Sequence, residues 1–289
     1  MSVSIIVFSA LFGLLVGSFL NVVLLRFGFE ESTRPRSHCQ SCHHILHWYE
    51  LIPLLSYLWV RGHCRHCGSR FSLQYPAVEL TVGALFAAVA FFSLPISTAA
   101  GLFSFGALLL FWAVFVLLVV YDVRHTLVPT SFAWLLVGSA LLVRLAEVFL
   151  RTPGDVLIDA LLGGALLAGF LGLIVLLTRG KGMGAGDIYI GLALGILFGV
   201  GRGIEVITLA FWVGAAVGIL LLITPRVLHA VRRALVLSPR SRVHRSGEAH
   251  SWFKMKSEIA FVPFLFIAAL LGMFTAISPF TLVLWVLPA

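Results

Sequence analysis

The sequence predicts an all-α polytopic membrane protein of about eight transmembrane helices, with a small soluble module between the first and second helices. Composition carries most of this prediction, because 60% of the residues are hydrophobic and only 11% are charged. The mean hydropathy of +1.06 lies well above that of a soluble domain. Charges are also absent from long runs, such as the 42 residues at 80–121. These runs are long enough for membrane-spanning helices.

The first apolar run, residues 3–25, is expected to be a retained transmembrane helix with its N-terminus outside. No basic residue precedes it and no small-residue cleavage site follows it, which argues against a removable signal peptide. The module follows at residues 26–75, and the remaining membrane domain at 76–289. Its spans are expected at residues 80–92, 99–121, 126–148, 156–178, 188–201, 204–224 and 259–287.

Basic residues set the orientation. This topology places 17 of the 20 Lys and Arg residues in segments on one side, which the positive-inside rule assigns to the cytoplasm. Residues 225–257 carry eight of them and are expected to form a lipid-facing cytoplasmic loop. Orientation in the bilayer therefore accounts for the net charge of +8, and no nucleic-acid partner is expected.

The module holds all four cysteines, as Cys39-x-x-Cys42 and Cys64-x-x-Cys67 with 21 residues between the pairs. Two such knuckles can bring four thiolates onto one tetrahedral zinc, which would fold a segment too small for a core of its own. Two disulfides are the alternative, but they require an oxidising compartment, whereas the charge of the module indicates the cytoplasm. Six histidines lie near the cysteines, and replacement of one thiolate by a histidine is a less favoured alternative. They are His38, His43, His44, His47, His63 and His66.

Three other features of this region have structural interpretations. Asn21, near the inner end of the first helix, is expected to bond to a neighbouring helix. The apolar and aromatic stretch 48–58 is either a filler beneath the zinc module or an element lying on the bilayer surface. Glu79 follows Pro76 and is expected to interact with the N-terminus of the second membrane helix.

Two aspartates lie at the ends of apolar runs. Asp187 follows the glycine-rich turn 182–186 and precedes the 14 uncharged residues 188–201. That run makes about 21 Å of helix, too short for a hydrocarbon core of about 30 Å, so a longer helix would draw Asp187 into the membrane edge. Asp122 ends the third span. Two crossings separate the aspartates, so both are expected on the cytoplasmic side.

Such a carboxylate pair predicts acid–base chemistry. A proton shared between two close carboxyl groups leaves one as a general base that activates water and the other as a general acid that polarises a scissile carbonyl. This is peptide hydrolysis without a covalent intermediate. Gly184 and Gly186 lack a Cβ atom and would let a substrate strand approach Asp187.

These motifs, in this order, closely resemble the type IV prepilin peptidases. The resemblance spans nearly the whole chain. It is carried by residues 17–21, the two CxxC pairs around residues 48–56, residues 75–79, Asp122 with Val128-Pro129, and residues 184–187.

The resemblance implies a GxGD-type intramembrane aspartic peptidase of the bacterial cytoplasmic (inner) membrane, with Asp122 and Asp187 as the catalytic pair. Its implied substrates are prepilins or pseudopilins, which have a basic leader and a hydrophobic N-terminal helix and serve pilus assembly or protein secretion. Many members also N-methylate the new terminus with S-adenosylmethionine, at a site that the sequence does not place. Members usually have an aspartate and a lysine where this chain has Thr130 and Tyr189.

The two aspartates are also compatible with two other classes of protein. A transporter could use both aspartates to bind protons or cations, with the module as a gate, and would place the carboxylates deep in discontinuous helices. A non-catalytic scaffold would use the aspartates as helix caps. The substitution Asp187→Asn discriminates, because a scaffold should tolerate an amide whereas a peptidase should lose cleavage.

Overall fold

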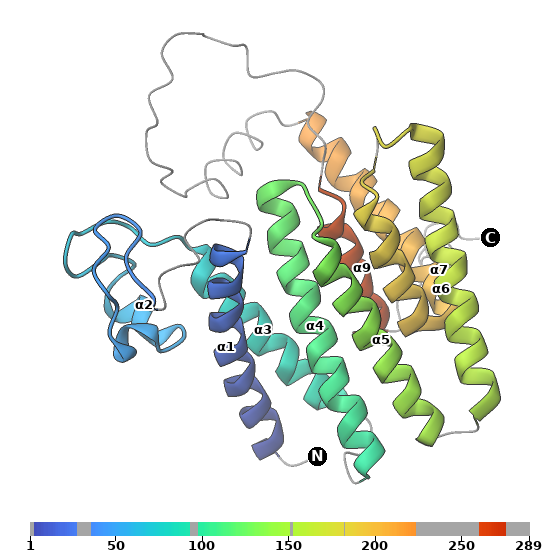
Figure 1. Ribbon diagram of the computed structural model, residues 1–289, viewed down its shortest axis with the longest axis horizontal. Helices are drawn as coiled ribbons and strands as arrows, with labels where there is room; N and C mark the ends of the chain where they lie inside the picture. The colour runs from blue at the N-terminus through green and yellow to red at the C-terminus, as the bar shows by residue number, and fades with distance from the viewer. Residues whose placement is uncertain are drawn as a thin grey trace, which may run out of the picture.

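Nine helical elements build the part of the chain that this computed structural model describes, which is residues 3–27, 36–92, 98–150, 153–181, 183–223 and 260–275. Figure 1 shows the long helices packed into one bundle, with the module beside α1. The elements are α1 (Val3–Arg26), η2 (Trp48–Leu51), α2 (Leu55–Trp59), α3 (Gln74–Phe92), α4 (Ala99–His125), α5 (Thr130–Leu150), α6 (Pro153–Thr178), α7 (Gly186–Ile223) and α9 (Val262–Phe274).

The all-α polytopic fold is confirmed. Six helices are long and apolar enough to cross a membrane, namely α1, α3, α4, α5, α6 and α7. The sixth and seventh expected spans are two arms of α7, and α9 falls within the last expected span. The expected basic loop 225–257 and the segment 276–289 lie outside the described residues.

Helix α7 is interrupted at Gly199, where φ is 74° and ψ is −171°. The first arm, residues 186–198, is about 20 Å long, well short of a hydrocarbon core of about 30 Å. The second arm returns toward the end where α7 begins, because the ring of Phe211 lies 5.2 Å from that of Phe261, just before α9. We call the end of the bundle where α7 begins the carboxylate end. We call the end that holds Gly199 the opposite end.

The core centres on α4, whose rings Phe111, Trp112 and Phe115 are fully buried. Trp112 packs against Phe266 and Phe274 of α9, with centroids 5.7 and 5.8 Å away. Such aromatic pairs add to the dispersion energy that replaces the hydrophobic effect between helices in lipid. Helix α4 is thus held on several sides, and its last turn carries Asp122.

The module joins the bundle through α1 and α3. These two helices lie so close together that a Cβ at Gly17 would come within 2.7 Å of the Glu79 Cα. Asn21 Nδ2 donates to the Tyr75 carbonyl of α3 at 3.1 Å, which confirms the expected bond to a neighbouring helix. The interpretation of Glu79 as a helix cap is wrong. Helix α3 begins at Gln74, so Glu79 lies beyond its first turn and accepts the N–H of Leu54 at 2.8 Å.

The stretch 48–58 forms η2 and most of α2, and its large apolar side chains point outward. Trp48 is 77% exposed and Leu58 is 70% exposed, and the adjoining Trp59 is 80% exposed. A filler beneath the module would bury these side chains, so that alternative is wrong. Exposed tryptophan and leucine are typical of an element that lies at a bilayer surface.

Candidate active site and metal centre

The structure brings Asp122 and Asp187 to the carboxylate end. Asp122 lies in the last turn of α4 and Asp187 in the first turn of α7, and each is only 5% exposed. Their carboxyl groups are near enough to interact electrostatically. Two side chains that are distant in sequence therefore form a buried acidic pair at one end of the bundle.

Helix N-termini surround this pair. The first residue of α9, Val262, donates its N–H to Asp122 Oδ2 at 3.2 Å. Asp187 sits at the N-terminus of α7, where its own N–H donates to the Gly184 carbonyl at 3.1 Å. The positive ends of two helices thus face the acidic pair. Neither carboxylate forms a salt bridge with any residue in the described ranges.

The two glycines of the turn differ in their surroundings. A Cβ at Gly186 would overlap the side chain of Val128, in the connection between α4 and α5. At Gly184 the nearest atom to such a Cβ is Asp187 Oδ2, at 3.9 Å. Gly186 therefore lets the start of α7 pack onto Val128, whereas Gly184 leaves space beside the carboxylate. Gly182 lies outside the described residues.

The two departures from the family pattern lie close to this site. Tyr189 packs its ring 5.2 Å from that of Trp134 on α5. Thr130 is the first residue of α5. Tyr189 therefore forms an aromatic contact between α7 and α5.

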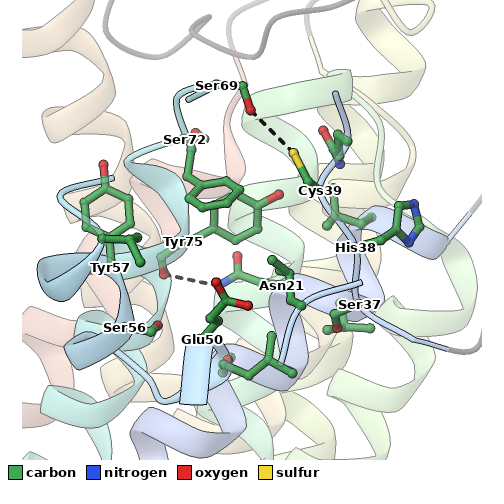
Figure 2. Close-up of a pocket in the computed structure, with 18 of the residues that line it drawn as sticks. Asn21, Ser37, His38, Cys39, Glu50, Ser56, Tyr57, Ser69, Ser72 and Tyr75 are labelled. Atoms are coloured by element: carbon green, nitrogen blue, oxygen red, sulfur yellow. Dashed lines mark hydrogen bonds between the residues drawn. The ribbon is translucent and has the colours of Figure 1, made fainter. Parts of the chain in front are cut away.

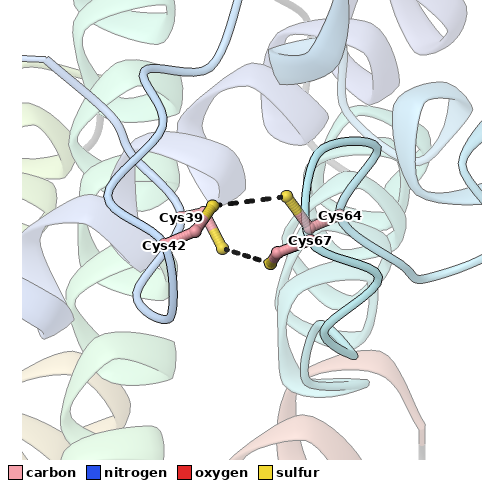
Figure 3. Close-up of side chains that lie close together, drawn as sticks. All are labelled: Cys39, Cys42, Cys64 and Cys67. Atoms are coloured by element: carbon pink, nitrogen blue, oxygen red, sulfur yellow. Dashed lines mark hydrogen bonds between the residues drawn. The ribbon is translucent and has the colours of Figure 1, made fainter.

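The four cysteines form a cluster whose sulfurs all lie within 4.8 Å of one another (Figure 3). The Sγ atoms of Cys39 and Cys67 are 3.8 Å apart, and those of Cys42 and Cys64 are 4.0 Å apart. Four Zn–S bonds of about 2.3 Å place tetrahedral sulfurs about 3.8 Å apart, so this spacing suits zinc. All four thiols are free, which excludes the disulfide alternative in this structure, and no histidine belongs to the cluster among the described residues.

Each cysteine pair lies on its own backbone turn, and the two turns are of the same kind. Cys39 N–H donates to the His44 carbonyl and Cys64 N–H to the Ser69 carbonyl, at 2.9 and 2.8 Å. The residue after each second cysteine has positive φ, 57° at His43 and 71° at Gly68. The module is therefore built from two similar knuckles that face each other across the sulfurs.

Without a cation, the four thiols cannot all ionise. Burial acts to raise the pKa of Cys39, but hydrogen bonds with Ser69 and with the Cys42 and Ser41 backbone outweigh it and lower the pKa to about 6. A backbone hydrogen bond at His44 favours the Cys42 thiolate, yet burial and the neighbouring Cys67, Cys39 and Cys64 sulfurs raise its pKa to about 12. A divalent cation would remove this conflict by stabilising all four thiolates.

Sequence reasoning missed a second polar cluster, at the opposite end. Arg144 of α5 donates to Glu147 Oε2 and to the Ile196 carbonyl of α7, both at 2.8 Å, and lies 3.9 Å from Asp159 of α6. Asp159 Oδ1 accepts the N–H of Val200, next to the break at Gly199. The available signal was the presence of three charged residues inside otherwise apolar spans.

Comparisons with known proteins agree with the motif resemblance. The family model described as the bacterial peptidase A24 N-terminal domain matches residues 11–93, and that of the type IV leader peptidase family matches residues 107–219. No solved structure matches the chain.

Several curated relatives carry the name prepilin leader peptidase/N-methyltransferase. That of Myxococcus xanthus is 37% identical over 226 residues, which cover 75% of this chain and 63% of the relative, less than two thirds of its length. That of Aeromonas hydrophila is 36% identical, covering 72% and 78%, and that of Bacillus subtilis is 34% identical, covering 79% and 87%. These matches favour a peptidase over a transporter. The chain belongs to the type IV leader peptidase family.

Proposed function

We propose that this chain is an intramembrane aspartic endopeptidase that removes the leader from type IV prepilins or pseudopilins at the cytoplasmic membrane face. Asp122 and Asp187 are its catalytic residues. The observation that carries the proposal is the buried acidic pair, which two helix ends supply from distant parts of the sequence. A buried carboxylate pair that forms no salt bridge with any described residue is costly as structure and suited to proton chemistry.

The pair hydrolyses a peptide bond by sharing one proton. Two buried like charges cannot both ionise cheaply, so one carboxyl keeps its proton. The ionised carboxylate takes a proton from water, whose oxygen forms a bond to the scissile carbonyl carbon. The protonated carboxyl donates to the carbonyl oxygen. When the intermediate collapses, the C–N bond breaks, the leaving nitrogen takes a proton, and the pair returns to its one-proton state.

The membrane arrangement suits a substrate with a basic leader and a hydrophobic N-terminal helix. The first arm of α7 is shorter than the hydrocarbon core, so Asp187 at its start lies near the depth where such a helix leaves the bilayer. The concentration of basic residues on one side supports the cytoplasmic assignment of the carboxylate end and of the module. In this proposal residues 76–289 form the peptidase domain, 26–75 the module, and 1–25 the first membrane helix.

The module holds a structural zinc ion through Cys39, Cys42, Cys64 and Cys67, in our proposal. The spacing of the four sulfurs supports this assignment. The four thiolates leave no open coordination position for substrate, so the ion stabilises the module rather than the reaction. Purified protein should contain about one zinc per chain by metal analysis. Cys64→Ser should lose the zinc and render residues 36–73 sensitive to protease, while an unchanged metal content would contradict the assignment.

The names of the relatives also support N-methylation of the new terminus. S-adenosylmethionine, when bound, supplies an electrophilic methyl group on a sulfonium sulfur. The residues that could hold it must offer contacts for its adenine, its diol and its charged amino-acid end. Aromatic, carboxylate and arginine side chains of this kind line a pocket between the module and the ends of α1, α3 and α4.

The decisive experiment is incubation of the purified full-length chain with a prepilin in detergent, with and without S-adenosylmethionine, followed by mass measurement of the substrate terminus. We expect loss of the leader in both samples and a further gain of one methyl group with S-adenosylmethionine. Intact leader on a substrate that a relative cleaves under the same conditions would overturn the peptidase proposal.

A further inference from the structure

A pocket of about 190 Å³ lies between the module and the ends of α1, α3 and α4 (Figure 2). Its walls include Asn21 of α1, Glu50 and Tyr57 of the module, and Tyr75 of α3. Neither Asp122 nor Asp187 lines it. The pocket is therefore separate from the acidic pair.

Asn21 points to a ligand in this pocket. The side chain is only 3% exposed, and its Nδ2 donates to the Tyr75 carbonyl. Its Oδ1 has no hydrogen-bond partner among the described residues. Figure 2 shows this side chain reaching into the pocket beside Glu50. A buried amide oxygen is almost always paired, so the site calls for a ligand that brings an N–H or O–H donor.

The other lining groups narrow the chemical class of that ligand. Tyr57, Phe71 and Tyr75 offer aromatic faces on which a flat heterocycle can stack. Glu50 and Glu79 bring carboxylates that can accept hydrogen bonds from a diol or attract a cation. The Arg36 and Arg70 guanidinium groups on the rim can bind a carboxylate. A ligand that matches these three groups of side chains has a flat ring system that carries hydrogen-bond donors. Another part of the ligand carries both a carboxylate and positive charge.

We propose that this pocket binds S-adenosylmethionine, with Asn21 Oδ1 accepting a hydrogen bond from the ligand and Tyr57 contacting its adenine. The inference rests on the proposed N-methyltransferase activity and gives that activity a location. Cys39 also lines the pocket, and its Sγ lies 3.4 Å from the Ser69 hydroxyl. One wall of the donor site is therefore a knuckle of the four-cysteine cluster.

Equilibrium dialysis of the full-length chain in detergent against radiolabelled S-adenosylmethionine tests the site. Wild-type protein should bind about one molecule per chain, as expected for a single preformed pocket. Asn21→Leu and Tyr57→Ala should each weaken binding by about tenfold or more, because each removes one specific contact. Tyr49→Ala is the matched control, since Tyr49 is another module tyrosine, 41% exposed, that does not line the pocket. Its binding should equal that of wild type.

A photoreactive 8-azidoadenine analogue gives a second readout that does not depend on variants. We expect the label in peptides from residues 36–75, identified by mass spectrometry. Labelling confined to residues 183–223, or undiminished binding by both variants, would overturn the pocket even if wild-type protein methylates its substrate. Absence of methylation and of binding in a preparation that cleaves the leader would overturn the methyltransferase proposal together with the pocket.

Discussion

Two groups of charged side chains lie at opposite ends of the first arm of α7, and they differ in how their charge is balanced. At the opposite end, Arg144 is 13% exposed at its side chain and contacts two carboxylates and a main-chain carbonyl. At the carboxylate end, Asp122 and Asp187 lie near enough to interact electrostatically, with backbone N–H groups and helix N-termini nearby. One cluster contains its own cation, and the other is a pair of like charges.

This difference separates a cluster with a structural role from an acidic pair suited to proton transfer. A cation held between carboxylates within the bundle fixes the helices that carry them, because any one partner left alone would be costly. Here it ties α5 and α6 to α7 at the point where Asp159 accepts the Val200 N–H beside the break. An acidic pair that has no salt-bridge partner in the described part of the chain instead keeps a proton available for transfer. The Arg144 cluster therefore helps to hold the first arm of α7 in place, and we propose that the acidic pair at the start of that arm carries out the reaction.

The largest expected effect comes from removing proton exchange at the acidic pair. Asp122→Asn and Asp187→Asn should each lower the rate of leader cleavage by about 10²- to 10⁴-fold, because an amide cannot act as general acid or base. The melting temperature should not fall, since each change removes one of two like charges. Rates and melting temperatures are measured on the same detergent preparations.

Asp155→Asn is the matched control for these changes. Asp155 is exposed in the first turn of α6, away from the acidic pair. Its cleavage rate should stay within about twofold of wild type, as for most surface substitutions. Equal rates for wild type and Asp187→Asn would favour the scaffold interpretation.

The next effect should appear in stability rather than in the chemical step. Arg144→Met keeps an unbranched, flexible side chain but leaves Glu147 and Asp159 without their cation. We expect the free energy of unfolding to fall by about 2–3 kcal/mol. This is a small loss for a broken ion-pair cluster, because both carboxylates are partly exposed. Thermal unfolding measures it, and Arg202→Met, at an exposed arginine of the same end, is the control. A drop of 10²-fold or more in the cleavage rate of fully folded Arg144→Met would break the distinction between the two clusters.

Much of the fold follows from the sequence because lipid imposes a simple rule on length and polarity. Uncharged runs predicted the positions of α1, α4, α5 and α6 to within four residues at each end, since only helices satisfy the backbone in hydrocarbon. Helix α3 begins at Gln74, six residues before the expected span 80–92. The two arms of α7 were also separated, although the break lies at Gly199 rather than in the expected loop after residue 201. The cysteine spacing predicted a compact metal cluster because two short knuckles fix the sulfurs locally.

Long-range contacts were beyond the reach of pattern reasoning. Glu79 was assigned to its own helix end, but a carboxylate goes to whichever N–H group the fold presents, here that of Leu54. The Arg144 cluster needs three helices, and no local pattern records which helices become neighbours. Gly186 was expected to let substrate approach, but the side chain of Val128 occupies the space that a Cβ at position 186 would need. Each of these residues contacts a partner at least 25 residues away in the sequence.

The smallest expected effect tests how accurately the start of α7 must be placed. Gly186→Ala introduces a Cβ that overlaps Val128 and so displaces the turn that carries Asp187. Overpacking of this kind costs about 1–3 kcal/mol, and misplacement of a catalytic group lowers the rate without removing its chemistry. We expect cleavage to fall about tenfold, a far smaller loss than that of Asp187→Asn.

Rescue separates displacement from any other effect of the added methyl group. Val128→Gly in the Gly186→Ala background removes the Val128 Cβ that the new Cβ overlaps, so the double variant should regain most of the cleavage rate. Gly184→Ala is the control within the same turn, because its Cβ would meet nothing closer than 3.9 Å. If Gly184→Ala impairs cleavage more than Gly186→Ala, the open space beside Asp187 matters more than the packing of α7, and that space is where the substrate backbone passes.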